Sequence, residues 1–265
     1  MTIFIGQKRA LLGARPAWTL ALLFASGEIG VWYDPSDIST LFQDAAGTIP
    51  VTAYGQPVGR ILDKSGNGIH ATQSTSSARP LWQEDTNGKP GLKFDAVNDF
   101  LVTSSINLSA VDSQFTCAGV RKLSDATTAI LCEFGDAGTG GQNGNFSIAA
   151  PFNASNRFAS FSEGTAGNWA TTTSFPAPVS AVVTAQGKIS SDTNILRING
   201  VQVAQNTGDQ GTGNYGNHPL YIGCRGGSSL WFNGFLHQLV IRGGALPDAA
   251  ELAAVEAYFA TKSGV

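Results

Sequence analysis

The chain has 265 residues, a length that all-β sandwiches commonly reach as one domain. Charged residues make up 13% of it, against about 25% in ordinary soluble domains, while glycine contributes 32 residues. The formal net charge is −3 and Lys and Arg form no stripe, which argues against nucleic-acid binding because phosphates are neutralised by clustered basic side chains. This composition favours a turn-rich β protein with a polar, uncharged surface.

The first 29 residues carry a large apolar load for a terminal segment. Lys8-Arg9 followed by Ala17–Ala25 imitates a signal peptide, so a secreted protein is one alternative, but Arg15-Pro16 interrupts the run. The run is far shorter than the ~20 residues that a membrane span requires, so we expect no membrane span. We predict that residues 1–29 are an assembly anchor outside the sandwich core, covered by neighbouring subunits or by the domain's own flank. The predicted anchor residues are Phe4, Trp18, Leu22, Leu23 and Phe24.

From about residue 90 onward, short β-rich runs alternate with Gly, Asn and Ser turns, and helical periodicity is almost absent. This spacing is typical of an antiparallel sandwich. The predicted strands are Leu92–Asp95, Phe100–Ser104, Gln114–Lys122, Ala129–Gly135, Phe146–Ala150, Arg157–Ser162, Trp169–Phe175, Ala181–Ala185, Ile195–Ile198, Val201–Gln205, Leu220–Cys224 and Gly234–Arg242. Asn199-Gly200 predicts the clearest hairpin, because both residues tolerate positive φ.

One helix is predicted, from Asp248 to Thr261. Asp248 and Glu251 have the spacing of a capping box, and apolar residues recur on one helix face. We expect that apolar face to pack on the sandwich.

Several motifs occur in a fixed order along the chain. They are Asp63-Lys-Ser-Gly-Asn-Gly-Ile-His-Ala-Thr72, Phe94-Asp-Ala-Val-Asn-Asp99, Phe232-Asn-Gly-Phe-Leu-His-Gln-Leu239 and Leu246-Pro-Asp-Ala-Ala-Glu251. Over roughly residues 55 to 262 this order resembles the laminin-G-like branch of the concanavalin A-like lectin/glucanase superfamily. The resemblance implies an all-β fold: an antiparallel β-sandwich of jelly-roll type at residues 30–265, with a short C-terminal helix and an N-terminal extension. The chain departs from the pattern at Ala96, where Gly is usual.

A narrower resemblance concerns three segments, Gly30–Asp44, Pro57–Ser65 and Ala118–Asp125, which resemble sequence segments found in bacteriophage and prophage structural proteins. It implies a non-enzymatic virion protein of the tail or a surface fibre, assembled in host cytoplasm. Its partners would be other virion proteins, copies of itself (a trimer by analogy) and host-surface glycans. The alternatives are a capsid decoration or head-fibre protein without a receptor role, and a glycan-active enzyme or secreted lectin.

The inventory of acidic residues disfavours a glucanase. Such an enzyme would carry Glu-x-Asp-x-x-Glu on one strand, which places alternate carboxylates on one face. None of the glutamates fits, and the nearest pair, Glu133 with Asp136, has opposite strand parity. His70, His218 and His237 are the only histidines, and no Gly-x-Ser-x-Gly elbow occurs. We therefore predict no catalytic residues, with His70 packing a turn and His237 satisfied or facing solvent.

No cofactor is predicted, with calcium as an alternative. The loop from Asp136 to Asn145 is rich in oxygen ligands but supplies one carboxylate only, and Asp136, Asn143 and Asn145 are its candidate ligands. The odd set of Cys117, Cys132 and Cys224 has no CxxC spacing, which indicates buried free thiols and no zinc site.

A sugar-binding surface needs an exposed aromatic ring flanked by hydrogen-bonding side chains. Two stretches have this composition, and the candidate residues are Asn168, Trp169, Asn214, Tyr215 and Asn217. The alternative reading of Trp169 is core packing.

Overall fold

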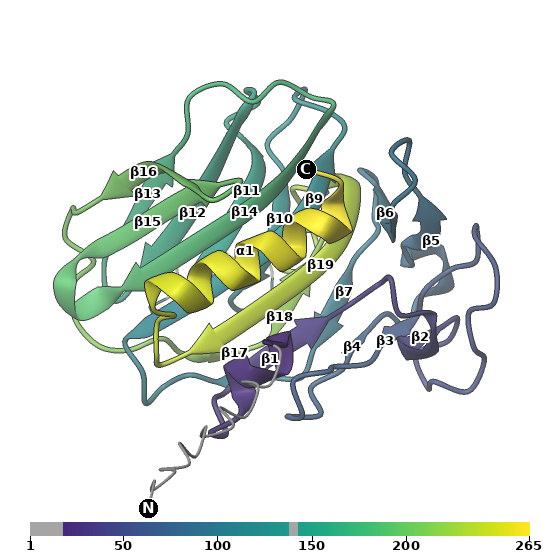
Figure 1. The fold of residues 1–265 in the computed structure, drawn as a ribbon, viewed down its shortest axis with the longest axis horizontal. Coiled ribbons are helices and arrows are strands. Elements are labelled where there is room, and N and C mark those ends of the chain that lie inside the picture. The colour runs from purple at the N-terminus through teal and green to yellow at the C-terminus, as the bar shows by residue number, and fades with distance from the viewer. Residues whose placement is uncertain (1–17, 138–142) are drawn as a thin grey trace, which may run out of the picture.

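Two antiparallel β-sheets stack face to face in the computed structural model, which describes residues 18–137 and 143–265 (Figure 1). We call the eight-stranded sheet, in the order β16-β15-β14-β9-β19-β6-β5 with β1 added to β19, sheet A. Its strands are β1 (Gly30–Tyr33), β5 (Leu81–Glu84), β6 (Pro90–Asp95), β9 (Ser113–Lys122), β14 (Val179–Lys188), β15 (Thr193–Ile198), β16 (Val201–Asn206) and β19 (Asn233–Gly243).

The nine-stranded sheet, sheet B, has the order β13-β12-β11-β10-β18-β7-β4-β3-β2. Its strands are β2 (Leu41–Phe42), β3 (Arg60–Ile61), β4 (Ala71–Thr72), β7 (Leu101–Thr103), β10 (Ile130–Phe134), β11 (Phe146–Phe152), β12 (Arg157–Glu163), β13 (Gly167–Thr171) and β18 (Leu220–Ile222). A separate pair joins β8 (Ile106–Asn107) to β17 (Asn217–His218). Short 3-10 helices are η1 (Leu20–Phe24), η2 (Ile38–Thr40), η3 (Ser76–Ala78) and η4 (Ile189–Ser191). The predicted sandwich is confirmed.

Strand sequences match the burial that the layers impose. On β15 buried and half-buried residues alternate, because one face meets the interior and the other does not. The central strands β9 and β19 are buried almost throughout, because the sandwich core covers one face and a helix covers the other. The predicted hairpin is confirmed, with Asn199 at φ +50° and Gly200 at φ +81°.

The covering element is α1 (Ala249–Ser263), drawn in yellow across sheet A in Figure 1. The Asp248 side chain caps its N-terminus by accepting from the backbone N–H groups of Ala250 and Glu251 at 2.9 and 2.8 Å. Gly264, at φ +72°, ends it. Val255 and Phe259 are fully buried against the outer face of sheet A, as the helical periodicity predicted.

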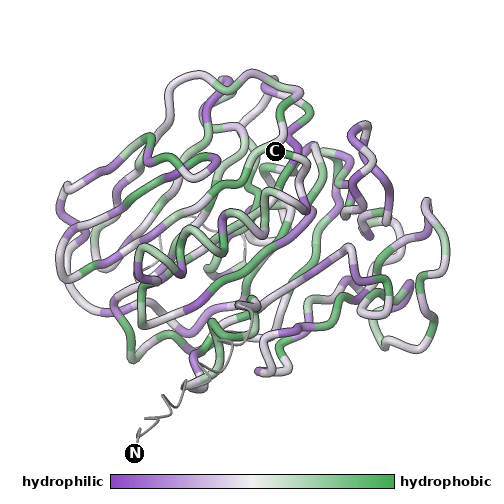
Figure 2. The backbone as a smooth tube through the Cα atoms, viewed as in Figure 1, coloured by the Kyte–Doolittle hydropathy of each residue, from purple (hydrophilic) through white to green (hydrophobic). Residues whose placement is uncertain are grey.

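Part of the N-terminal segment packs on the domain's own flank, which is one of the two covers that the sequence left open. Leu20, Leu23 and Phe24 are buried in the same hydrophobic cluster as Val255 and Phe259, and much of this apolar stretch is green in Figure 2. These three side chains are therefore covered by the domain's own flank, where they pack in one cluster with α1 and the outer face of sheet A.

The anchor residues are thus divided. Trp18 is half-buried and meets the Tyr258 ring edge-on, with 6.5 Å between centroids, whereas Leu22 is 46% exposed. Phe4 lies outside the described residues. Along the described chain no helix is long and apolar enough to cross a membrane.

Replacing Leu23 by Ala should cost about 2–5 kcal/mol of unfolding free energy, because it leaves a cavity beneath α1. Leu22→Ala removes the same side chain from an exposed position and should change stability by less than about 0.5 kcal/mol. Chemical denaturation of both variants compares them directly; equal losses would contradict the packing described here.

The Asp63 loop joins the N-terminal strand to the rest of the sandwich. The Asp63 carboxylate accepts from the backbone N–H groups of Trp32, Ser65 and Ile69 at 2.9 to 3.1 Å. His70 Nδ1 accepts from the Asp63 N–H at 3.0 Å, so this histidine packs a turn as predicted. The motif residues therefore act structurally, by holding β1 against the loop.

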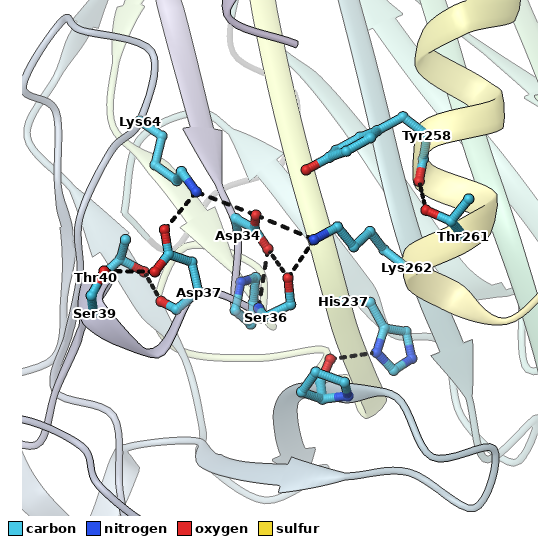
Figure 3. Close-up of polar contacts among 12 residues, drawn as sticks. Asp34, Ser36, Asp37, Ser39, Thr40, Lys64, His237, Tyr258, Thr261 and Lys262 are labelled. Carbon is cyan, nitrogen blue, oxygen red and sulfur yellow. Dashed lines mark hydrogen bonds and ion pairs between the residues drawn. The ribbon is translucent and has the colours of Figure 1, made fainter. Parts of the chain in front are cut away.

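A second set of contacts joins the same region to α1 (Figure 3). Asp34 lies between two ammonium groups: Lys64 Nζ is 3.4 Å and Lys262 Nζ is 3.7 Å from its Oδ2. Lys64 also pairs with Asp37 at 2.7 Å, which lowers the Asp37 pKa. The end of α1 is thereby fixed to the chain that follows β1.

The turn after β6 contains Ala96, the position at which the sequence pattern usually has Gly. Ala96 adopts φ +67°, a left-handed conformation that costs a residue with a Cβ roughly 1–2 kcal/mol. Asp99 Oδ2 accepts from the Asp95 N–H at 3.1 Å. Burial, and then the Asp95 charge, raise the pKa of Asp99 to about 7.

Asp99 should make stability depend on pH. Because its folded pKa lies above the ordinary value of 3.8, its contribution is fully present below that value and is lost as the pH rises through about 7. Asp99→Asn keeps the acceptor without the charge, so it should raise Tm by about 2 °C or more at pH 8 and by less at pH 5. Exposed Asp209→Asn is the control; a gain independent of pH would contradict the assignment.

The three cysteines are free and buried, as predicted. Burial raises the pKa of Cys132 and of Cys224 to about 12, and raises the pKa of Cys117 still further. A buried thiol in this state forms little thiolate, so none of the three is primed for nucleophilic chemistry.

Candidate functional site

The outer face of sheet B is the candidate site. The one α-helix among the described residues lies on sheet A, so no α-helix lies on sheet B (Figure 1). Strand pairing places one row of side chains across five strands of this face. In order the row is Trp169, Phe161, Ser147, Glu133 and Tyr221.

The row points outward because its chain neighbours point inward. Phe146 and Ile148 flank Ser147 and belong to the sandwich core, as Cys132 and Phe134 do on either side of Glu133. Successive side chains of a strand alternate between faces, and directly paired residues share a face. These five side chains therefore lie side by side.

One end of the row is aromatic. Trp169 is half-buried between the rings of Phe152 and Phe161, with centroids 4.6 and 4.8 Å away. The rings of Phe152 and Trp169 pack on a small apolar cluster of this face that includes Ala149 and Ala159. The contacts with Phe152 and Phe161 fix the position of the Trp169 ring without a ligand, so the three rings form a preorganised aromatic platform.

The other end is aromatic as well. Phe100 contacts both Tyr221 and Trp231, with centroids 6.4 and 6.0 Å apart. Four strand spacings of about 4.8 Å separate Trp169 from Tyr221, or about 19 Å across the sheet.

The centre of the row is polar. Glu133 is 3% exposed and accepts from Arg225 Nε at 3.1 Å. Burial raises the pKa of Glu133 although Arg225 opposes the shift, and burial alone raises the pKa of Glu163, two residues beyond Phe161 on β12. Glu133 is on β10 and Glu163 is on β12. Ser147, on the intervening strand β11, and Asn145, the residue just before β11, lie between them.

Of the predicted glycan-binding residues, Trp169 lies on this face and Asn168 does not. The Asn168 side chain points the opposite way, is buried, and donates to the Gly208 carbonyl at 2.6 Å. Adjacent strand residues cannot share a face, so the proposed Asn168-Trp169 pair is corrected to Trp169 alone.

The second predicted stretch lies at the rim of the sandwich. Tyr215 is 1% exposed; its hydroxyl is 2.8 Å from Ser162 Oγ and its ring meets Phe146 edge-on. It is a core residue, so its assignment to sugar contact was wrong. Asn214 and Asn217 are exposed, and Asn214 donates to the Ser109 carbonyl at 2.9 Å.

The proposed calcium loop is only partly described. Asp136 Oδ1 is 2.8 Å from His218 Nδ1, and the Asn143 carbonyl oxygen is 3.3 Å from His218 Nε2. Asn145 lies on the outer face of sheet B, and residues 138–142 lie outside the described part. Within the described ranges no group of three His, Cys, Asp or Glu could hold a metal. Calcium at this loop stays a prediction.

Chelation should leave stability unchanged, because the Asp136 carboxylate already pairs with an imidazole. Melting curves in EDTA and in excess CaCl2 should superimpose. A site occupied at 100 times its Kd contributes about 2.7 kcal/mol, so a fall in Tm of about 5 °C on adding EDTA would mean that a structural calcium was missed.

His237 is buried, so of the two alternatives left open by the sequence, a satisfied side chain or one that faces solvent, the second is wrong. Its Nδ1 is 3.0 Å from the Pro90 carbonyl oxygen and its Nε2 is 3.5 Å from Asp85 Oδ2. Burial lowers the pKa of His237. The ring lies beneath the surface of sheet A, away from the candidate face.

A hollow of about 430 Å³ lies beside α1 on sheet A, the sheet opposite the candidate face. It is lined by Arg197, Asn199, Gly200, Ala253, Glu256, Ala257, Ala260 and Val265. Its two charged side chains pair with each other, Arg197 Nε to Glu256 Oε1 at 2.8 Å. Their charges are therefore already satisfied, and the hollow offers less to a polar ligand than the face of sheet B does.

The family model of the concanavalin A-like lectin/glucanases superfamily matches residues 95–250. No curated protein is similar in sequence. Among solved structures, the botulinum neurotoxin serotype G binding domain aligns with a TM-score of 0.55 at 12% identity, covering 75% of this chain and 48% of that one. The binding domain of botulinum neurotoxin DC in complex with SialylT gives 0.54 at 11% identity, with 75% and 48% covered.

A smaller domain, the Ruminococcus gnavus IT-sialidase CBM40, is covered over 97% of its length by 58% of this chain, at 16% identity and a TM-score of 0.44. The two alignments to the toxin binding domains show a similarity of fold.

Proposed function

Because this chain belongs to the concanavalin A-like lectin/glucanase superfamily, we propose that it is a non-enzymatic carbohydrate-binding sandwich that acts as a structural, host-attaching protein of a bacteriophage virion. The sandwich would present the outer face of sheet B to host-surface glycans, while other surfaces join it to virion proteins and to copies of itself.

One observation carries the carbohydrate-binding role: two aromatic clusters flank a polar centre on a single sheet face. Sugar rings have apolar faces that pack on aromatic rings and hydroxyls that need hydrogen-bonding partners. A row about 19 Å long offers both in alternation, so an extended oligosaccharide suits it better than a monosaccharide.

Two points support binding without catalysis. The paired-glutamate motif of a glucanase strand is missing, and Glu133, which lies on the candidate face, is held by Arg225. The DC toxin domain, whose fold is similar, was solved in complex with SialylT, which illustrates one lectin-like sandwich in a binding role.

The virion role is supported by the resemblance of Gly30–Asp44, Pro57–Ser65 and Ala118–Asp125 to phage structural proteins, and by the low charge content. Exposed Leu22 and half-buried Trp18 are the described members of the anchor set that remain for contact with other subunits, and a trimer is our first expectation. Locating the chain in virion density by cryo-EM would separate a tail or fibre position from a capsid decoration.

Trp169→Ala should weaken oligosaccharide binding about tenfold, because it removes the central ring of the aromatic platform. Tyr54→Ala removes a 49% exposed ring that stacks on Trp82 of sheet A, and serves as the matched control. Titration calorimetry after a glycan-array screen measures both, with Tm recorded for each variant. Equal affinities, or no carbohydrate bound by the wild type, would refute the proposed site.

A further inference from the structure

We propose that the polar centre of sheet B selects an uncharged or amino sugar rich in hydrogen-bond donors, and rejects sialylated or otherwise anionic glycans. This rests on the proposed function and concerns the chemistry of its ligand. The polar centre consists of Glu133, Asn145, Ser147, Glu163 and Arg225.

Three of its members, Glu133, Ser147 and Glu163, lie on the adjacent strands β10, β11 and β12, and Asn145 directly precedes β11. Glu133 on β10 is paired directly with Ser147 on β11, and the Glu163 N–H donates to the Asn145 carbonyl at 3.1 Å. Asn145 lies two residues before Ser147, so the two share a face. The side chains thus form a compact patch between the two aromatic clusters.

Four of the five side chains, all except that of Arg225, have a buried polar atom without a hydrogen-bond partner. The unpaired atoms are Glu133 Oε2, Asn145 Oδ1, Ser147 Oγ and Glu163 Oε2. The residues themselves are between 3% and 8% exposed. Buried polar atoms normally have hydrogen-bond partners, so four unpaired ones on a single patch indicate a place where a partner from outside the chain binds.

All four unpaired atoms are oxygens, and with both glutamates ionised three of them can only accept. The nearby Arg225 guanidinium donates through Nε to Glu133 Oε1, so one of the two glutamates already offsets its positive charge. A ligand complementary to the patch must therefore supply O–H or N–H groups, and hydrogen bonds to a carboxylate are among the stronger ones in proteins.

Formal charge leads to the same conclusion. With two glutamates and one arginine, the polar centre carries a net negative charge when both carboxyls are ionised. A ligand carboxylate, sulfate or phosphate would meet unpaired acceptor oxygens of the same sign, which is a common way for a site to discriminate against a wrong ligand. Neutral hexoses, N-acetylhexosamines and free amino sugars avoid that repulsion.

The test uses the full chain and matched glycans. An array should carry cellotetraose, chitotetraose, N-acetyllactosamine oligomers and the sialylated forms of the same oligomers, with calorimetry on the best neutral ligand and its sialylated form. We expect the neutral ligand to bind at least about tenfold more tightly than its sialylated form. A sialylated ligand that binds equally or more tightly overturns the inference.

Glu163→Gln tests the acceptor directly, because it removes charge at nearly constant shape. It should raise the Kd of the neutral ligand about tenfold and reduce the ratio between the Kd values of the sialylated and neutral ligands. Glu84→Gln, at an exposed position on sheet A, should change neither Kd. An unchanged Kd in Glu163→Gln counts against the inference even if Trp169→Ala still abolishes binding. Loss of all carbohydrate binding in the wild type would instead refute the proposed function.

A bound cation is the competing use of an oxygen-only patch. Millimolar CaCl2 should leave Tm unchanged in the wild type and in Glu163→Gln. If CaCl2 stabilises the wild type and not the variant, the oxygens hold a metal and the sugar assignment is wrong.

Discussion

The packing of α1 against sheet A determines what the rest of the molecule can do. Val255 and Phe259 of the helix, with Leu23 of the N-terminal segment, bury the outer face of β9, β14 and β19. That burial gives sheet A two hydrophobic faces and makes it the structural layer. Sheet B has one face in the core, and no α-helix of the described residues covers its other face, so that face is the one proposed to bind a ligand.

Much of this fold could be predicted from the sequence, because its strands obey local rules. Asn199-Gly200 fixes a hairpin through positive φ, and Asp248 begins a helix through its carboxylate. The place of Leu20 and Leu23 could not be predicted in the same way. Apolar side chains near a terminus indicate that something covers them, but only the three-dimensional structure shows that the cover is α1 and not another subunit.

The candidate site was much harder to predict for a similar reason. Trp169 was identified because an aromatic beside amides is a local signal, and Tyr215 was misassigned on that same signal because burial depends on packing with Phe146 and Ser162. Phe161, Ser147 and Glu133 were not selected. Period-two alternation puts each on one face of its strand, but the register that makes them neighbours joins residues tens of positions apart.

The three buried cysteines bear on how the fold tolerates a change of redox environment. A virion protein, the role proposed above, would fold in reducing cytoplasm and afterwards persist in oxidising surroundings. With every thiol enclosed and its pKa raised, the described fold needs no disulfide and offers no reactive sulfur to an oxidant. In the proposed virion role, this subunit would leave the host without a redox-driven change. A single cysteine introduced on the outer face of sheet B would then be the one sulfur open to a maleimide probe, which makes that face accessible to site-directed labelling.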